Sequence, residues 1–245
     1  MKYMGSKSRI AKYICPIIQD YIDRYNIKTY CEPFVGGANV IDKIKCETKI
    51  GSDLNRYLIA LLIRVRDNKG LYEEVPKDLY DKARKAFNNG DTSDFSDWEI
   101  ANIGFIASYN GRFFDGGYAK TGIEKTKNGE RLRNYYQESL NNLLKQAPNL
   151  KGITFKCNDY KEIKLHNALI YCDPPYKGTK SYITDIKFNY EEFWQTMREW
   201  SKNNIVLISE QNAPKDFKCV WEHQVSRSIK ANDKTKATEK LFIYK

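Results

Sequence analysis

The feature that most constrains the fold is a run of five apolar residues, Ala168–Cys172, which leads directly into Asp173-Pro174-Pro175-Tyr176. A short continuous apolar run beside turn residues is typical of a β-strand that is buried on both faces. Such strands belong to parallel sheets covered by helices on both sides. The two prolines that follow lack N–H donors and hold the backbone extended. The run therefore predicts an α/β fold.

The rest of the chain alternates between strand and helix patterns, in the order of an open α/β sheet. Helices are predicted at 6–25, 38–44, 54–66 and 190–201. Strands are predicted at 29–31, 49–53, 152–157, 168–172 and 204–209, with two weaker strands at 219–225 and 241–244.

The middle of the chain breaks this alternation, because it contains helices and loops but no convincing strand. The pattern is helical at 98–109 and 130–145, and 110–129 reads as a long loop rich in Gly, Asn, Lys and Thr. Loops this long are usually functional or disordered. We therefore predict an α/β domain made of residues 1–66 and 151–245, split by a helical insertion at 67–150. Its loops would lie over the carboxyl ends of the strands, where open α/β sheets bind ligands.

Composition narrows the class of partner. Lys and Arg total 41 against 31 Asp and Glu, a formal net charge of +10, which suits a polyanion, although many basic proteins never touch nucleic acid. The six cysteines form no CxxC pair and only two histidines are present, so we expect no metal site. The start lacks the apolar core of a signal peptide, and no stretch approaches a membrane span. We expect a cytoplasmic protein.

The residues after the buried strand predict chemistry at an amino group. The Asp173 carboxylate beside a proline carbonyl forms a pair of acceptors for the two N–H donors of the exocyclic amine of adenine. Accepting both hydrogens from one side favours a pyramidal nitrogen whose lone pair points at an electrophile, such as a sulfonium methyl group. Tyr176 offers a flat face on which a base can stack. The candidate catalytic residues are Asp173, Pro174, Pro175 and Tyr176; the alternative is an edge turn closed by prolines.

A second candidate site follows the first predicted strand. Two adjacent glycines, Gly36 and Gly37, allow a tight turn and close approach of a ligand to the backbone. The GxGxxG fingerprint is absent, which argues against a nicotinamide enzyme. Asp53 ends the next strand, where a carboxylate can accept hydrogen bonds from ribose hydroxyls. Its alternative role is an N-cap before Leu54.

The start of the chain, Tyr3-Met4-Gly5-Ser6-Lys7, is a glycine-containing segment before a helix. Lys7 could pair with the methionine carboxylate of a cofactor, and Tyr3 could flank it. The alternative is a disordered start.

Four segments occur in this order along the chain: Tyr3 with Lys7, Pro33-Phe34-Val35-Gly36-Gly37, Asp53, and Asp173-Pro174-Pro175-Tyr176. Together they resemble the Dam-like adenine-specific DNA methyltransferases of bacteria and phages. The resemblance runs from Lys2 to about Phe242, and Ser6 departs from it where many relatives carry a second Gly. It implies a Rossmann-like methyltransferase sheet, a target-recognition insertion and S-adenosyl-L-methionine as methyl donor. The cofactor-binding residues that it implies are Tyr3, Lys7, Pro33, Phe34, Gly36, Gly37, Asp53, Asp159 and Asp173. Asp159 has an equally good alternative role as the cap of a turn.

The DNA-binding residues are less marked in the sequence. Residues 108–114 resemble the segment that leads into the family's recognition loop, so we predict that Asn110, Arg112 and Lys177 contact double-stranded DNA. Residues 112–151 and 215–245 each carry eight Lys or Arg against four Asp or Glu, which suits phosphate contacts. For any single lysine, a solvated charged surface is the alternative. Residues 209–214 follow a strand and would border the target site.

The sequence therefore predicts a site-specific DNA adenine methyltransferase that flips adenine over Tyr176. A second possibility keeps the chemistry and changes the acceptor to cytosine N4, an RNA adenine or a protein glutamine. A third is a DNA-binding module that has lost catalysis, which the intact set of candidate catalytic residues disfavours.

Overall fold

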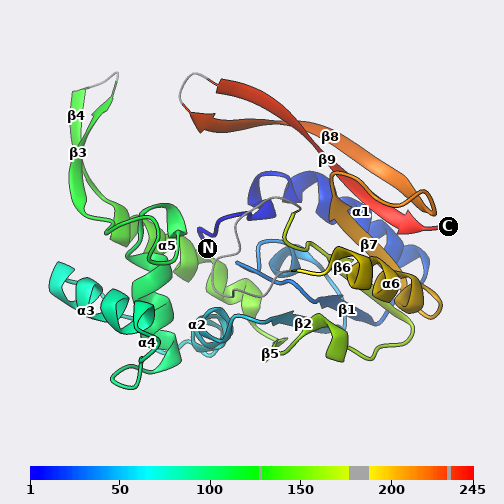
Figure 1. The fold of residues 1–245 in the computed structure, drawn as a ribbon, viewed down its shortest axis with the longest axis horizontal. Coiled ribbons are helices and arrows are strands. Elements are labelled where there is room, and N and C mark those ends of the chain that lie inside the picture. Colours follow the sequence, from blue (N-terminus) through cyan, green and yellow to red (C-terminus); the bar gives the residue numbers. More distant parts are fainter. Residues whose placement is uncertain (127–128, 177–187, 231–232) are drawn as a thin grey trace.

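The computed structural model describes residues 1–126, 129–176, 188–230 and 233–245, and it is built around a seven-stranded mixed sheet (Figure 1). The strands from β5 to β7 pair in parallel, whereas β9 pairs antiparallel with both β7 and β8. The α/β fold predicted from the sequence is confirmed. The order across the sheet is β5 (Ile153–Cys157), β2 (Thr48–Asp53), β1 (Thr29–Glu32), β6 (Ala168–Cys172), β7 (Ile205–Glu210), β9 (Asp233–Tyr244) and β8 (Phe217–Lys230).

Strand β6 is buried at all five positions because hydrophobic clusters cover both of its faces. Leu169 and Tyr171 belong to one cluster, which includes side chains of α1, α2 and α5. Ile170 and Cys172 belong to the other, which includes side chains of α6. Full burial of an aliphatic side chain contributes about 1.5–3 kcal/mol, so these faces fix the position of β6 in the sheet. The helices are α1 (Ala11–Arg24), α2 (Arg56–Arg66), α5 (Tyr135–Leu150) and α6 (Tyr190–Ser201).

The sequence predicted helices and loops without a strand between α2 and β5. This prediction is wrong, because the segment contains a β-hairpin. Strands β3 and β4 pair antiparallel, with Ile123 opposite Leu132. These two side chains are 69% and 76% exposed, so neither face of the hairpin produces the apolar alternation that marks a half-buried strand. The predicted helix at 130–145 begins later, at Tyr135, where Asn134 caps it by accepting from the N–H of Gln137. The elements of this segment are α3 (Lys77–Asn88), α4 (Asp97–Ala101), a π-helical turn (Asn102–Ile106), β3 (Thr121–Thr126), β4 (Gly129–Asn134) and α5.

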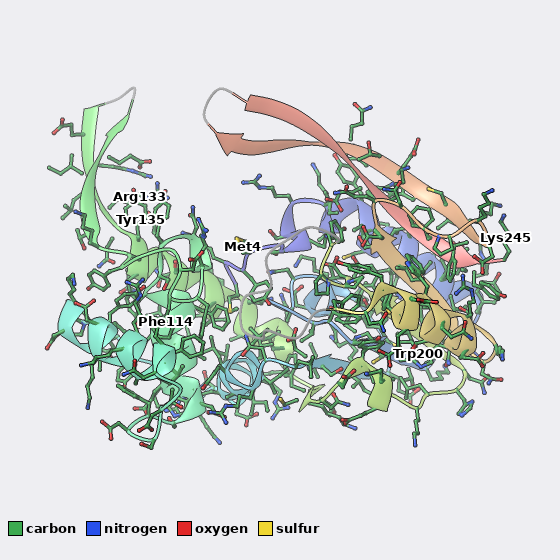
Figure 2. The ribbon with its side chains drawn as sticks, viewed as in Figure 1. Met4, Phe114, Arg133, Tyr135, Trp200 and Lys245 are labelled. Carbon is green, nitrogen blue, oxygen red and sulfur yellow. The ribbon has the colours of Figure 1, made fainter. Side chains whose placement is uncertain are left out.

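The β3–β4 hairpin is attached to the protein through charged side chains at its base. Arg133 bonds to Glu124 and, through two nitrogens, to Glu138. Its guanidinium also lies 4.7 Å from the ring centre of Tyr135, beside it in Figure 2. In Figure 1 this hairpin and the β8–β9 hairpin rise from the same side of the molecule. In the described ranges, no helix has the length and apolar character that crossing a membrane requires.

The predicted helix at 38–44 is wrong, since only a single 3-10 turn forms at Ile41–Lys43. Ala38 has φ +55°, a left-handed conformation that a helix cannot contain. The Asn39 amide donates instead to the carbonyl of Met1 and to the Ser6 hydroxyl. These bonds hold the N-terminal segment against the glycine turn.

Candidate active site

The N-terminal segment brings the two halves of the candidate site together at the carboxyl edge of the sheet. The Tyr3 side chain lies over the glycine turn: a Cβ on Gly36 would lie 3.0 Å from Tyr3 Cε1, and one on Gly37 would lie 2.8 Å from Tyr3 Cβ. Four residues later, the Lys7 ammonium lies 2.9 Å from Asp173 Oδ1. The turn after β1 and the acid after β6 therefore flank the same short segment, as a shared site requires.

Lys7 lies between two carboxylates and an aromatic ring. Besides Asp173, its ammonium lies 3.6 Å from Glu239 Oε2 and 4.3 Å from the ring centre of Tyr176. The side chain of Lys7 is only 9% exposed. A buried cation is stable only where opposite charges compensate its desolvation, and these two carboxylates do so. The structure thus places the ammonium on carboxylates of the protein, and pairing with a cofactor carboxylate stays a prediction.

The charges of this cluster depend on one another. Burial opposes the charged form of Lys7, but the combined effect of its neighbours, with Asp173 first and Glu239 among them, outweighs burial, so the pKa of Lys7 lies above its ordinary value. Burial raises the pKa of Asp173, and Lys7 offsets part of this rise. Burial and the neighbouring carboxylates raise the pKa of Tyr176 well above its ordinary value. The Tyr176 phenol therefore stays protonated and acts as a donor.

The Asp173–Tyr176 turn is fixed at its C-terminal end by hydrogen bonds. The Tyr176 hydroxyl donates to Glu239 Oε2 at 2.8 Å and lies 3.2 Å from the hydroxyl of Ser209, at the carboxyl end of β7. The hydroxyl of Tyr190, on α6, donates to the carbonyl of Pro175 at 2.7 Å. The Pro175 carbonyl therefore already accepts one hydrogen bond within the protein.

The glycine turn and Asp53 are bonded to each other. The N–H of Gly36, which has φ +48°, donates to Asp53 Oδ2 at 3.1 Å. Asp53 Oδ1 accepts from the N–H of Asn55 at 3.0 Å, and burial raises the pKa of Asp53 while these backbone hydrogen bonds lower it. The N-cap role weighed for Asp53 belongs to Asn55, whose side chain accepts from two N–H groups at the start of α2. Capping of α2 therefore does not account for Asp53, and its contact with a cofactor stays a prediction.

A second loop lies beside the glycine turn. The ring centre of Phe34 is 5.2 Å from that of Tyr160, just after β5. Asp159 caps the short 3-10 turn there by accepting from the N–H of Lys161 at 3.0 Å, so its capping role is confirmed while contact with a cofactor stays a prediction. The Oδ1 atom of Asn158 is buried and has no hydrogen-bond partner among the described residues. Buried acceptors are normally satisfied, so this atom marks a place for an external donor.

Two of the predicted DNA-binding residues, Asn110 and Arg112, lie at the short 3-10 turn Tyr109–Gly111. Asn110 is exposed with φ +56°, and the Arg112 guanidinium, in a side chain that is 46% exposed, lies 2.8 Å from Asp115. A Cβ on Gly111 would meet the carbonyl of Lys2 at 2.5 Å, so this loop packs against the same N-terminal segment that carries Lys7. Lys177 lies outside the described residues.

Sequence reasoning missed Glu239 and Tyr190. Tyr190 begins a helix and shows no motif. Glu239 lies in an antiparallel strand whose pairing partner on β7 is about 30 positions away, so nothing in its neighbourhood marks it as part of the site. Glu239 lies between Thr238 and Lys240, just before the apolar run Leu241–Tyr244, and a polar residue there is typical of an exposed position.

Comparison with known proteins agrees with this geometry. The type II methyltransferase M.MjaIII of Methanocaldococcus jannaschii is 27% identical over 229 residues, which cover 78% of this chain and 74% of that protein. The type II methyltransferase M.FokI of Planomicrobium okeanokoites is 24% identical over 81% of this chain. The modification methylase StsI of Streptococcus sanguinis is 26% identical over 84% of this chain. The chain spans about a third of the length of these two relatives, 32% in each case.

The family model of the D12 class N6 adenine-specific DNA methyltransferases matches residues 3–206. Because this match spans most of the sequence, the chain belongs to the D12 class N6 adenine-specific DNA methyltransferases.

Proposed function

We propose that this protein transfers a methyl group from S-adenosylmethionine to the N6 amine of an adenine that is flipped out of duplex DNA. The observation that carries the proposal is the position of Asp173, which follows β6 and is held by Lys7 beside Tyr176. A carboxylate and an aromatic ring are thereby fixed next to the segment that covers the glycine turn. The family match supports the choice of adenine N6 over the other acceptors.

The residues present suit S-adenosylmethionine as methyl donor. The glycines at 36 and 37 let the Tyr3 side chain pack directly on the backbone of the turn, where a Cβ would meet it, so Tyr3 is in position to flank a cofactor at this turn. Each oxygen of Asp53 accepts one backbone N–H, and a carboxylate oxygen can accept further bonds, so ribose hydroxyls have an acceptor there. The unpartnered Oδ1 of Asn158 suits an adenine amine. Phe34 provides apolar surface between these groups.

The chemistry follows from where the acceptors point. Asp173 and the Pro174 carbonyl would accept the two hydrogens of the amine, while the Tyr176 ring supports the base. S-adenosylmethionine, when bound, would supply an electrophilic methyl group to the amine nitrogen and leave as the neutral thioether. The methylated nitrogen would then lose one proton, which Asp173 would accept and pass to solvent. Burial raises the pKa of Asp173, which makes it a better proton acceptor than an exposed carboxylate.

We further propose that residues 67–150 form the target-recognition part of the protein. Its β3–β4 hairpin exposes Ile123 and Leu132, and apolar side chains on a projecting ribbon can contact thymine methyl groups in the major groove. Arg112 lies in the loop that packs against the N-terminal segment, and Lys177 and Asn110 complete the predicted contacts. The net charge of +10 supports attraction to phosphates.

Replacing Asp53 by alanine tests the cofactor part of the site. We expect the affinity for S-adenosylmethionine to fall by about tenfold or more, because hydrogen bonds to a charged acceptor contribute about 1.5–3 kcal/mol, whereas DNA affinity should change little. Isothermal titration with the cofactor and a fluorescence-anisotropy titration with DNA measure the two. Unchanged cofactor affinity would show that Asp53 only supports the turn.

Replacing Arg112 by alanine tests the DNA part of the site. If Arg112 contacts a phosphate, we expect DNA affinity to weaken and the slope of log K against log salt to fall by about 1. Arg24→Ala is a matched control, since Arg24 is also exposed and paired with a nearby aspartate, Asp20. Equal salt slopes for Arg112→Ala and the unmodified protein would remove Arg112 from the interface.

Expression in a methylation-free bacterial host tests the proposed function as a whole. Sequencing of modified bases in the host genome should reveal N6-methyladenine at one short recurring sequence. Modified cytosine would point to the N4 acceptor. An unmodified genome together with methylated RNA or protein would move the activity to those substrates.

A further inference from the structure

Glu239 reaches the active site because of the direction of its strand. Strand β9 runs antiparallel to β7, and the last pair between them joins Glu210 of β7 to Lys240 of β9. Glu239 precedes Lys240, so it lies just beyond the carboxyl end of β7, at the edge where the candidate active site is built. The family match ends at residue 206, well before this strand.

The Glu239 carboxylate contacts two groups of the site with the same oxygen. Its Oε2 accepts the hydroxyl of Tyr176 at 2.8 Å and lies 3.6 Å from the Lys7 ammonium. The side chain is 9% exposed. A hydrogen bond from a phenol to a buried carboxylate is among the stronger and more directional contacts in proteins. It restricts rotation of the Tyr176 ring, and the Lys7 ammonium attracts the same carboxylate oxygen.

We infer that Glu239 is a positioning residue for methyl transfer, which orients the Tyr176 ring through this hydrogen bond so that a base stacked on the ring presents its amine to Asp173. The inference rests on the proposed function. Small errors of placement in a direct displacement cost large factors in rate, so a ring that is free to tilt would slow the chemical step more than binding. The C-terminal hairpin would thereby take part in catalysis without touching the substrate.

Kinetics of Glu239 variants, alone and in a Tyr176→Phe background, test this role. We expect Glu239→Ala to lower kcat by about tenfold or more with KM for S-adenosylmethionine nearly unchanged, and Glu239→Gln to recover several-fold, because the amide oxygen still accepts from the phenol. In a Tyr176→Phe background the hydrogen bond is already lost, so adding Glu239→Ala should cost less than about threefold. Glu222→Gln is the matched control, because Glu222 is exposed on neighbouring β8, and it should behave as the unmodified protein.

Three outcomes would each overturn the inference. They are a normal kcat in Glu239→Ala, no recovery in Glu239→Gln, and a full additional loss in the Tyr176→Phe background.

A spectroscopic measurement tests the same contact independently of activity. In protein labelled with ¹³Cζ-tyrosine, the resonance that disappears in Tyr176→Phe should shift in Glu239→Ala and stay in place in Glu222→Gln. An unmoved Tyr176 resonance in Glu239→Ala would show that the hydrogen bond does not form. If the unmodified protein fails to methylate adenine, the proposed function fails on its own, and this resonance still decides the contact.

Discussion

Replacement of Asp173 by alanine is expected to reduce methyl transfer by roughly 10²–10⁴-fold, the range found for a positioned proton acceptor. The variant loses the carboxylate that would accept a hydrogen of the amine and later its proton. It also removes the 2.9 Å partner of Lys7. Single-turnover methylation of duplex DNA measures the loss, and cofactor titration shows whether binding survives.

Asp173→Asn is the informative companion of this variant. The amide keeps one acceptor oxygen but carries no charge and cannot take up a proton. We expect it to bind S-adenosylmethionine and DNA and to remain far slower than the unmodified protein. Turnover of Asp173→Ala at the unmodified rate would refute the role assigned to this carboxylate.

Replacement of Lys7 by methionine is expected to lower activity at neutral pH by about tenfold or more and to shift its pH dependence. Methionine fills the buried volume without the charge, so Asp173 and Glu239 lose the cation between them. Lys7 lowers the pKa of Asp173, which burial raises; without Lys7 this pKa rises further. The protonated acid accepts the amine hydrogen more weakly and cannot take up its proton, so the active fraction falls at any pH near or below the new pKa.

The pH dependence of Lys7→Met activity should shift in one direction, toward higher pH. Activity requires ionised Asp173, so it declines as pH falls through the folded-state pKa of that group, and a higher pKa moves this decline to higher pH. Rates of Lys7→Met should therefore recover partly as pH is raised. Lys12→Met, at an exposed position on α1, is the control and should keep the unmodified profile. An acid limb of Lys7→Met at the same pH as in the unmodified protein would contradict the coupling.

The parts of the site that could be predicted from sequence are those fixed by local chemistry. The apolar run at Ala168–Cys172 identifies a strand buried on both faces whatever surrounds it, and the prolines after it mark where the chain leaves the sheet. The paired glycines likewise require a turn after β1. Asp53 could be placed at the end of a strand because parallel strands end at a common edge.

The parts that escaped prediction depend on contacts between distant segments. The β3–β4 hairpin exposes its apolar residues Ile123 and Leu132, so its sequence resembles that of a loop. Residues 38–44 look helical, but bonds from Asn39 to the N-terminal segment hold Ala38 in a left-handed conformation. Glu239 joins the site only through an antiparallel pairing that no local pattern encodes. The bonding of Lys7 to two carboxylates of the protein could not be foreseen for the same reason.

The central claim is that Asp173 and Tyr176 direct methyl transfer to adenine N6 in DNA. Its most direct test incubates the purified protein with unmethylated duplex DNA and isotope-labelled S-adenosylmethionine, digests the DNA to nucleosides and identifies the labelled product by mass spectrometry. We predict labelled N6-methyl-2′-deoxyadenosine, formed by the unmodified protein and not by Asp173→Ala. Label in N4-methyl-2′-deoxycytidine, or no label in the DNA at all, would contradict the claim.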